Sequence, residues 1–268
     1  MPPALATDDV LTLLQDVAAE VVTPRFRALA DDHITEKRPG SLVTIADHEA
    51  EAAITAVLNR AYPDAVVLGE EAYEHDPSLM ERYQRARHVF TVDPVDGTRN
   101  FVEGSPDHAL MVAELRDAAI VRSWIWQPEH RVAWVAEQGA GTYRNGERVH
   151  LTQIADPLAA QGATSMWSMR NRRLGRLPTM RMSWFSCAID YPRLIEGEID
   201  FLLYKRGTNP WDHAPGTLMV REAGGSVGHS DGSDYDPRHL RPGIIVARDE
   251  SVFTTVSADA DAAFARRR

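Results

Sequence analysis

The stretch spanning residues 88–101 constrains the fold of this chain more than any other part of the sequence. A run of β-branched and aromatic residues ends in two carboxylates, Asp93 and Asp96, which a proline turn separates, and Gly97 and Thr98 follow at once. Such a run is typical of a strand, and a small polar residue at this place is typical of a helix start. The stretch therefore predicts a strand that leads into a helix through a tight, acidic corner.

Two carboxylates in one tight turn predict a bound cation, because like charges at short range oppose the ionisation of both groups. Oxygen ligands favour a hard divalent ion, and Mg²⁺ is the most plausible one. Directly after the acids, Gly97 allows a ligand to approach the backbone, and the helix that begins at Thr98 points unpaired N–H groups outward, as phosphate sites do. Carboxylates, metal and helix start together indicate phosphoryl chemistry.

Size and composition narrow the choice of protein class. The 268 residues, of which 44% are hydrophobic, suffice for one large domain or two small ones. The formal net charge of −10 argues against general binding of nucleic acid or of an anionic membrane, since both favour a basic face. The single cysteine, Cys187, excludes an internal disulfide. With no signal-peptide pattern and no apolar run of membrane length, the cytoplasm is the expected location.

In residues 1–153 the apolar pattern predicts helices laid on a large, mostly antiparallel sheet. Helical spacing marks residues 8–29, where Pro24 kinks or ends the helix, and residues 44–58. Residues 34–40 are polar and are expected to form a loop, whose Lys37 and Arg38 are either solvated surface charge or bases that reach an anionic site. A short helix is expected at residues 78–87, and strands are expected at residues 65–68, 109–115, 120–126, 132–136 and 142–143.

In residues 154–268 strands and helices alternate, which predicts a second, smaller α/β region. Asp212 is expected to cap a helix that has Pro215 in its first turn. Cys187 stands at another helix start, a position that lowers a thiol pKa. We expect both regions to form one rigid body with the active site in the cleft between them, and the three C-terminal arginines to form a frayed tail. The expected strands are 162–166, 182–185, 199–204, 226–228 and 244–247, and the expected helices are 187–196, 211–223 and 251–265.

Three motifs follow one another in a fixed order along the chain. Asp93 to Phe101 reads Asp-Pro-Val-Asp-Gly-Thr-Arg-Asn-Phe, Leu68 to Glu71 ends in an acidic pair, and Trp211 to Gly216 carries a further aspartate. Together they resemble the signatures of the inositol monophosphatase-like family of Mg²⁺-dependent, lithium-sensitive phosphatases, and weaker similarity covers residues 42–47 and 137–146. The resemblance implies a layered α/β fold, the five-layer αβαβα sandwich, with two or three Mg²⁺ ions, inhibition by Li⁺ and a homodimer.

The resemblance also implies roles for individual residues. Thr98, together with Glu70 and Asp47, is expected to orient a metal-activated water, so that no protein nucleophile is required. The backbone N–H groups of Gly97 and Thr98 are expected to hold the phosphate. Ser41 departs from the pattern, since the family has an acid there. The implied Mg²⁺ ligands are four carboxylates and one backbone carbonyl, those of Glu70, Asp93, Asp96, Asp212 and Val95.

The sequence leaves the substrate open. Inositol-specific members of the family place a glutamate shortly before the Trp-Asp motif, whereas this chain has Tyr204, Lys205 and Arg206 in that region. Tyr204 or Lys205 is therefore expected at the substrate-binding position, and Cys187 at a small position that lines the substrate. A cation suits a second anionic group, so histidinol phosphate, fructose 1,6-bisphosphate and nucleoside bisphosphates stand beside inositol monophosphate as candidates.

Two other functions use similar residues. A regulatory homologue would bind sugar phosphates or metal without turnover, although a pure binding protein has little reason to gather four buried acids. A metal-dependent nuclease would use two-metal chemistry, but the acidic net charge and the lack of a basic, aromatic stripe argue against it. The sequence therefore predicts a phosphomonoesterase that hydrolyses a small phosphorylated metabolite.

Overall fold

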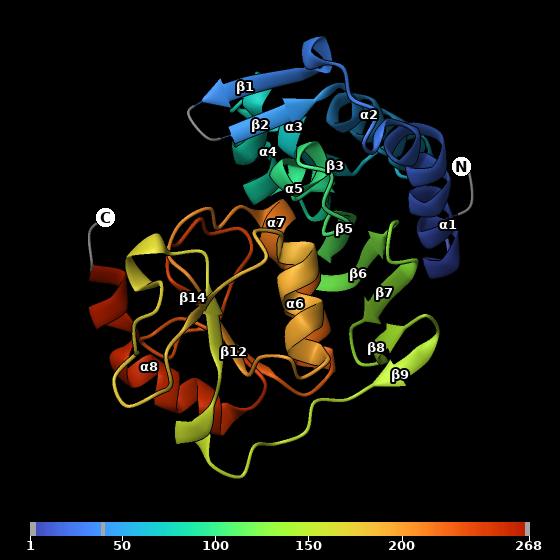
Figure 1. Ribbon diagram of the computed structural model, residues 1–268. Helices are drawn as coiled ribbons and strands as arrows, with labels where there is room; N and C mark the ends of the chain where they lie inside the picture. The colour runs from blue at the N-terminus through green and yellow to red at the C-terminus, as the bar shows by residue number, and fades with distance from the viewer. Residues whose placement is uncertain (1–3, 39–40, 266–268) are drawn as a thin grey trace.

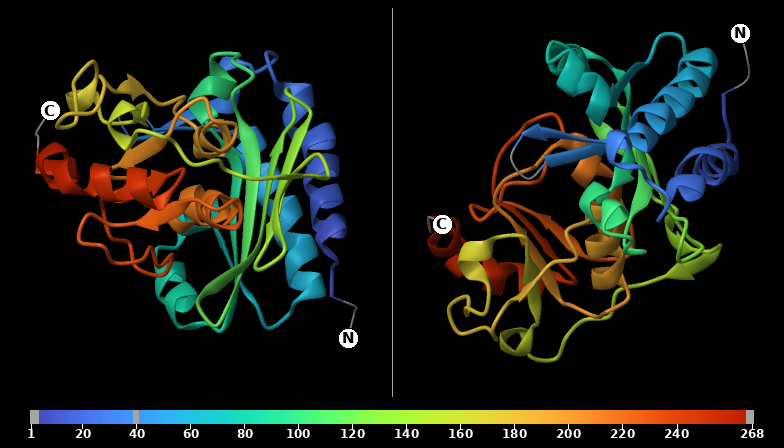
Figure 2. Two further views of the ribbon diagram at one scale, coloured as in Figure 1. Left: turned by 90° about the horizontal axis from the view of Figure 1, so that it is seen from below. Right: turned by 45° about the horizontal axis from the view of Figure 1, so that its top comes forward.

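The computed structural model describes residues 4–38 and 41–265, and its helices and sheets lie in five layers (Figure 1). Two helices, α1 and α2, cover one face of a seven-stranded sheet, and α6 and α7 cover the other face. The same middle helices lie against a five-stranded sheet, whose far face packs on α8 (Figure 2, left). The predicted αβαβα sandwich is confirmed. These helices are α1 (Thr7–Val17), α2 (Ile45–Ala61), α6 (Cys187–Ile195), α7 (Pro210–Glu222) and α8 (Glu250–Ala265).

The large sheet holds its strands in sequence order, from β3 to β9. The first pair, β3 and β4, is parallel, and each later pair is antiparallel, which confirms the predicted meander. Trp124 and Trp134 are buried in the packing on this sheet. The strands are β3 (Val66–Gly69), β4 (His88–Asp96), β5 (Ala109–Arg116), β6 (Ala119–Gln127), β7 (Val132–Glu137), β8 (Gly141–Arg144) and β9 (Glu147–Val149).

The outer helices close one face of the large sheet. Val10, Leu14 and Val17 recur at helical spacing in α1 and are buried against the sheet and α2. The helix continues as a π turn and a 3₁₀ turn and ends around Pro24, as predicted. Helix α2 starts from a capping box in which the Asp47 carboxylate accepts the N–H of Thr44 at 2.8 Å. This box places Asp47 on the inner side of the helix start.

The small sheet has the order β11-β10-β12-β14-β13, and β10 runs parallel to both of its neighbours. Short helices follow the first two strands of the large sheet: α3 (Glu70–His75) after β3, and α5 (Thr98–Val102) after β4. The strands are β10 (Gly162–Thr164), β11 (Arg181–Met182), β12 (Phe201–Tyr204), β13 (Ser226–Gly228) and β14 (Ile244–Ala247); the remaining short helices are α4 (Leu79–Arg85) and the 3₁₀ turns Asp31–His33, Pro157–Ala159 and Trp167–Met169.

Residues 34–38 form a strand, so the predicted loop is wrong there. β1 (Ile34–Arg38) pairs antiparallel with β2 (Ser41–Thr44), while Pro39 and Gly40 lie outside the described residues. A two-stranded hairpin with both faces partly open to water needs no apolar alternation, which is why the polar sequence did not indicate a strand.

Lys37 is not the solvated surface base that one interpretation of the sequence proposed. Its side chain is only 11% exposed, and Nζ donates to Glu70 Oε1 at 3.0 Å and to Glu71 Oε1 at 2.6 Å. Arg38 is exposed and pairs with Glu74. The hairpin thus brings one largely buried cation to the start of α3.

Within the part of the chain that the structure describes, no helix is long and apolar enough to cross a membrane. The C-terminal arginines, predicted to form a frayed tail, lie outside the described residues.

Candidate active site

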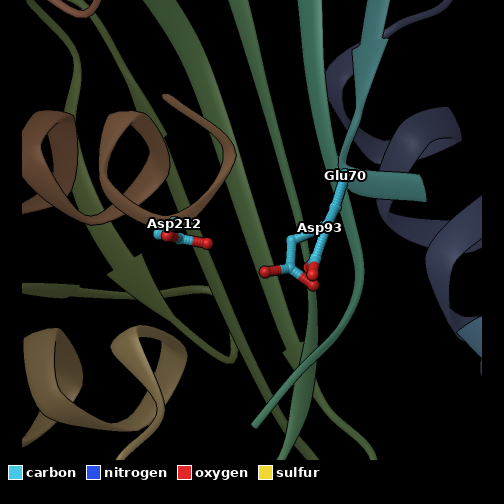
Figure 3. A group of neighbouring side chains, drawn as sticks. All are labelled: Glu70, Asp93 and Asp212. Atoms are coloured by element: carbon cyan, nitrogen blue, oxygen red, sulfur yellow. The ribbon is translucent and has the colours of Figure 1, made fainter. Parts of the chain in front are cut away.

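Three carboxylates from three separate elements meet between the large sheet and the middle helices. Glu70 at the start of α3, Asp93 in β4 and Asp212 in the first turn of α7 each offer an oxygen, and these oxygens all lie within 4.8 Å of one another. Figure 3 shows the Glu70 and Asp93 side chains side by side and that of Asp212 pointing toward them from the opposite helix. This is the donor set that a hard divalent cation prefers.

The register of the parallel strands brings the first two acids together. Gly69 of β3 is paired with Val92 of β4, so the next residues, Glu70 just after the end of β3 and Asp93 within β4, stand at the same level. Gly69 also makes room for a neighbouring carboxylate, because a Cβ there would lie 2.2 Å from Cδ of Glu51. Helix α7 crosses the other side of the sheet and supplies the third acid.

Burial and the charges of neighbouring acids oppose the ionised form of two of these three acids, Asp93 and Asp212. Burial raises the pKa of Asp93 well above its usual value, and the charges of Glu70, Asp96 and Asp212 raise it further. Burial and the neighbouring acids Glu70 and Asp96 likewise raise the pKa of Asp212. A cation between the carboxylates would remove this penalty, so the residues present fit a divalent metal ion.

Lys37 compensates part of the negative charge. Burial lowers the pKa of Lys37, but the adjacent Glu70 and Glu71 outweigh this effect, so the ammonium group stays charged. It pairs with one oxygen of Glu70, on the side of the strand hairpin. Lys37 therefore holds Glu70 in place but leaves Asp93 and Asp212 without a cation among the contacts of the described residues.

In the metal-free protein we expect the free energy of unfolding to fall by about 2 kcal/mol as the pH rises from 7 to 8.5. Burial raises the pKa of Asp47 and of Glu51 to about 7, and burial with neighbouring acids raises the pKa of Asp93 and of Asp212 well above the usual value. The folded state then binds protons that the unfolded chain has already released, so deprotonation favours unfolding. Urea denaturation in EDTA at both pH values measures the effect.

Saturating Mg²⁺ is the control for this pH dependence, because a bound cation replaces the protons of the cluster and flattens the profile. Buried neutral histidines such as His213, whose pKa burial lowers to about 4, act in the opposite direction mainly below pH 7. A metal-free stability that rises from pH 7 to 8.5 would contradict the assignment of proton-holding carboxyls.

Asp96 lies outside the group of three and organises the neighbouring helix. Its Oδ2 accepts the hydroxyl of Ser186 at 2.5 Å and the N–H of Ala188 at 2.7 Å, which are at the start of α6. Burial raises the pKa of Asp96 to about 6, although the Ser186 hydroxyl and the helix N–H groups lower it. Asp96 thus joins the acidic corner of β4 to the second region of the chain.

Thr98 and Asp47, predicted as partners in catalysis, are in contact. The Thr98 hydroxyl lies 3.2 Å from Asp47 Oδ1 and 3.1 Å from the carbonyl oxygen of Val95, both of which are acceptors. The Val95 carbonyl, a predicted metal ligand, therefore faces the start of α5. This arrangement gives one hydroxyl two acceptors beside the acidic cluster.

Gly97 is required by its conformation and by its surroundings. Its φ is +85°, and a Cβ would lie 2.9 Å from the carbonyl oxygen of Asp107 and 3.0 Å from Cβ of Ser186. We expect Gly97→Ala to lower the free energy of unfolding by about 3 kcal/mol, from left-handed strain and overpacking together. Urea denaturation measures the loss.

Gly146→Ala is the matched control for Gly97→Ala. Gly146 has a similar φ of +81°, but apart from Gly146 and its two chain neighbours no atom of the described residues lies within 4 Å of the position of an added Cβ. We expect it to lose only the strain, about 1 kcal/mol. Equal losses for both variants would show that contact with Asp107 and Ser186 costs nothing.

The predicted substrate residues occupy different environments. Cys187 is half-buried, and its Sγ lies 4.0 Å from Nδ1 of His213. Burial and the nearby Asp96 and Asp212 raise the pKa of its thiol, so the expected lowering of this pKa is wrong. Tyr204 is buried, and its hydroxyl donates to Asp190 at 2.9 Å. Lys205 lines a separate hollow of about 470 Å³ beside Phe264.

His213 is a buried histidine with a partner at each ring nitrogen. Nδ1 lies 2.9 Å from the hydroxyl of Tyr191, and Nε2 lies 2.9 Å from the carbonyl oxygen of Gly207. A neutral ring with its proton on Nε2 satisfies both contacts, and burial lowers its pKa to about 4. His213 thereby fixes the segment that leads into α7.

The predicted cap of α7 is wrong. The helix begins at Pro210 with Asn209 in the cap position, so Asp212 lies inside the first turn and Pro215 lies further along the helix. The signal was present in the sequence, because proline is common at the first position of a helix. The Asn209 side chain donates to Asp212 Oδ2 at 3.1 Å and orients this carboxylate.

Glu51 is a buried residue near the site that the sequence analysis missed. Its carboxylate accepts the N–H groups of Glu71 and Ala72, both at 2.8 Å, and so caps the start of α3 just behind Glu70. An acid four residues after Asp47, on the helix face that also carries Ile54 and Leu58, was the available signal.

Comparisons with known proteins agree with this geometry. The family model described as "Inositol monophosphatase family" matches residues 6–262. The chain is similar to the inositol-1-monophosphatase of Mesorhizobium japonicum, with 31% identity over 85% of each protein. It is also similar to the fructose-1,6-bisphosphatase/inositol-1-monophosphatase of Thermotoga maritima, with 28% identity over 74% of this chain and 76% of the relative.

A solved structure extends the similarity to the fold. The structure of a Thermotoga maritima IMPase aligns with a TM-score of 0.79 and 25% sequence identity, and the alignment covers 96% of this chain and 98% of the solved one.

Proposed function

This chain belongs to the inositol monophosphatase family, and on that premise we propose that its acidic cluster binds Mg²⁺ and that it hydrolyses a small phosphorylated metabolite. Members of the family are phosphatases, hydrolases of phosphoric monoesters. The observation that carries the proposal is the meeting of Glu70, Asp93 and Asp212 within 4.8 Å. Two or three Mg²⁺ ions, with the Asp96 carboxylate and the Val95 carbonyl as further ligands, are part of the proposal.

Metal bound there would polarise the phosphoryl oxygens and supply an activated water. The residues of the chain do the rest. The Thr98 hydroxyl, with Asp47 as its acceptor at 3.2 Å, would orient the attacking water and receive its proton, with Glu70 beside it. The N–H groups of Gly97 and Thr98 would hold the phosphate, since they open α5.

The substrate is inositol monophosphate or a related phosphomonoester. Histidinol phosphate, fructose 1,6-bisphosphate and nucleoside bisphosphates are the alternatives that the sequence left open. The test is phosphate release from each of these, with and without Mg²⁺, and with and without Li⁺. We expect hydrolysis that depends on Mg²⁺ and is inhibited by Li⁺.

The same experiment separates an enzyme from a regulatory binding protein. One outcome would favour a sugar-phosphate-binding regulator and reject the phosphatase: calorimetry shows that Mg²⁺ binds, but no substrate in the panel is hydrolysed. The homodimer and the cytoplasmic location expected from the sequence stay predictions, and sedimentation of the purified protein tests the first of them.

A further inference from the structure

Two large aromatic side chains lie exposed and stacked beside the proposed site. Trp167 is 51% exposed and Phe185 is 42% exposed, and their ring centroids are 5.8 Å apart at an interplanar angle of 24°. The guanidinium of Arg170 lies over the Trp167 ring at 5.4 Å. We call these three side chains the aromatic rim. The rim is an ordered stack of flat groups on a surface where burial does not explain it.

The sheet topology sets Trp167 and Phe185 at the same end of the small sheet, next to a residue that contacts the acidic corner of β4. β10 and β11 are parallel and Thr164 is paired with Met182, so Trp167 and Phe185 each stand three residues beyond paired positions at one edge of the sheet. Phe185 directly precedes Ser186, whose hydroxyl donates to Asp96. This is the carboxyl edge of parallel strands, where ligands of such sheets bind.

A second contact ties the same segment to the proposed phosphate loop. The Asn100 side chain, from α5, donates to the carbonyl oxygen of Trp184 at 2.9 Å. Gly97 packs against Ser186, because a Cβ added to Gly97 would lie 3.0 Å from Cβ of Ser186. The backbone that carries Phe185 is therefore in contact with the residues that would hold the phosphate.

Phe185 occupies a conformation that a bulky residue rarely adopts. Its φ is +57°, in the left-handed region where glycine or asparagine is the usual residue. Its phenyl ring is 42% exposed and stacks on the exposed Trp167, so burial in the core does not account for this conformation. A strained residue held next to a site points to a functional role.

We propose that the aromatic rim binds the leaving group of the substrate and selects phosphomonoesters whose alcohol carries a flat aromatic or heteroaromatic ring. This inference rests on the proposed phosphatase function and narrows its substrate class. A flat ring extends the existing stack of guanidinium, indole and phenyl groups, whereas the rim offers no acceptor for the hydroxyls of a polyol.

Two esters with the same carbon skeleton test the proposal: 2-phenylethyl phosphate, whose ring is flat and aromatic, and 2-cyclohexylethyl phosphate, whose ring is puckered and saturated. With saturating Mg²⁺ we expect the wild-type protein to prefer the phenyl ester about tenfold in kcat/KM, as one stacking contact provides. Trp167→Leu and Phe185→Gly should each reduce this ratio to about twofold. Phe185→Gly also relieves the left-handed strain, so it is expected to fold.

Leu240→Ala is the matched control. Leu240 is 41% exposed, like the rim residues, but belongs to a different segment, and the variant should keep the wild-type ratio. A wild-type ratio near one overturns the proposal. The proposal is also overturned if the two rim variants lose kcat/KM equally with both esters and if sedimentation shows that an oligomer has dissociated. The rim would then be an interface between copies of this chain.

Failure of the proposed function has a different signature. If no phosphate is released from any ester, the phosphatase proposal fails, and binding of the two matching phosphonates then decides about the rim. Calorimetry should show tighter binding of 2-phenylethylphosphonate than of 2-cyclohexylethylphosphonate, and Trp167→Leu should remove the difference. Equal affinities would overturn the rim proposal independently of catalysis.

Discussion

Asp93→Asn will lower kcat/KM by about a thousandfold or more and will at the same time stabilise the metal-free protein. The loss of activity follows because Asp93 is the buried member of the three-carboxylate group, and an amide neither carries the charge that holds a cation nor replaces it. The gain in stability follows because burial, Glu70 and Asp96 all oppose the ionised form of this side chain. The neutral asparagine removes the electrostatic cost of ionising this buried carboxyl, which otherwise only a bound metal ion would offset.

Thermal unfolding with and without Mg²⁺ separates the two effects. In EDTA we expect the variant to gain about 1–2 kcal/mol over the wild type, which raises Tm by a few degrees. On addition of Mg²⁺ the wild type should gain stability by mass action and the variant should not. Asp64→Asn, a change at an exposed acid, is the control and should behave as the wild type does. If the variant were less stable than the wild type in EDTA, the repulsion argument would be wrong.

The acidic corner was predictable because it is contiguous in sequence. Asp93, Asp96, Gly97 and Thr98 stand within six residues, and their geometry follows from one strand end, one tight turn and one helix start. The meander and the outer helices were predictable for the same reason, since period 2 and period 3.6 patterns are local. A local pattern indicates which side of a helix or strand is buried, but it does not indicate which other element packs against that side.

The long-range contacts of the site could not be predicted from local pattern. Asp212 was placed with Asp93 only by family resemblance, because nothing in the spacing brings α7 to the end of β3. Lys37 had the sequence context of a surface base, and its burial depends on a hairpin packing over α3. Glu51 accepts a backbone N–H of the distant helix α3, and Ser186 donates to the carboxylate of the distant Asp96; such contacts leave little trace in the sequence.

Thr98→Ala will lower kcat about a hundredfold while leaving the affinity for Mg²⁺ within a few fold of the wild type. The hydroxyl that is lost lies 3.2 Å from Asp47 Oδ1 and 3.1 Å from the Val95 carbonyl oxygen, and it is not a member of the three-carboxylate group. If the hydroxyl orients the water, its removal affects the reaction step more than substrate binding. Thr98→Ser restores the hydroxyl and should recover most of kcat.

A double-mutant cycle with Asp47→Asn tests whether the two residues act as a unit. The asparagine oxygen can still accept the N–H of Thr44, so the capping box survives and the change mainly removes the charge that would accept a proton. We expect each single variant to lose about a hundredfold in kcat and the double variant to lose little more, because each variant alone already disables the pair. Fully additive losses would mean that Thr98 and Asp47 contribute separately, and that the contact between them only stabilises the start of α5.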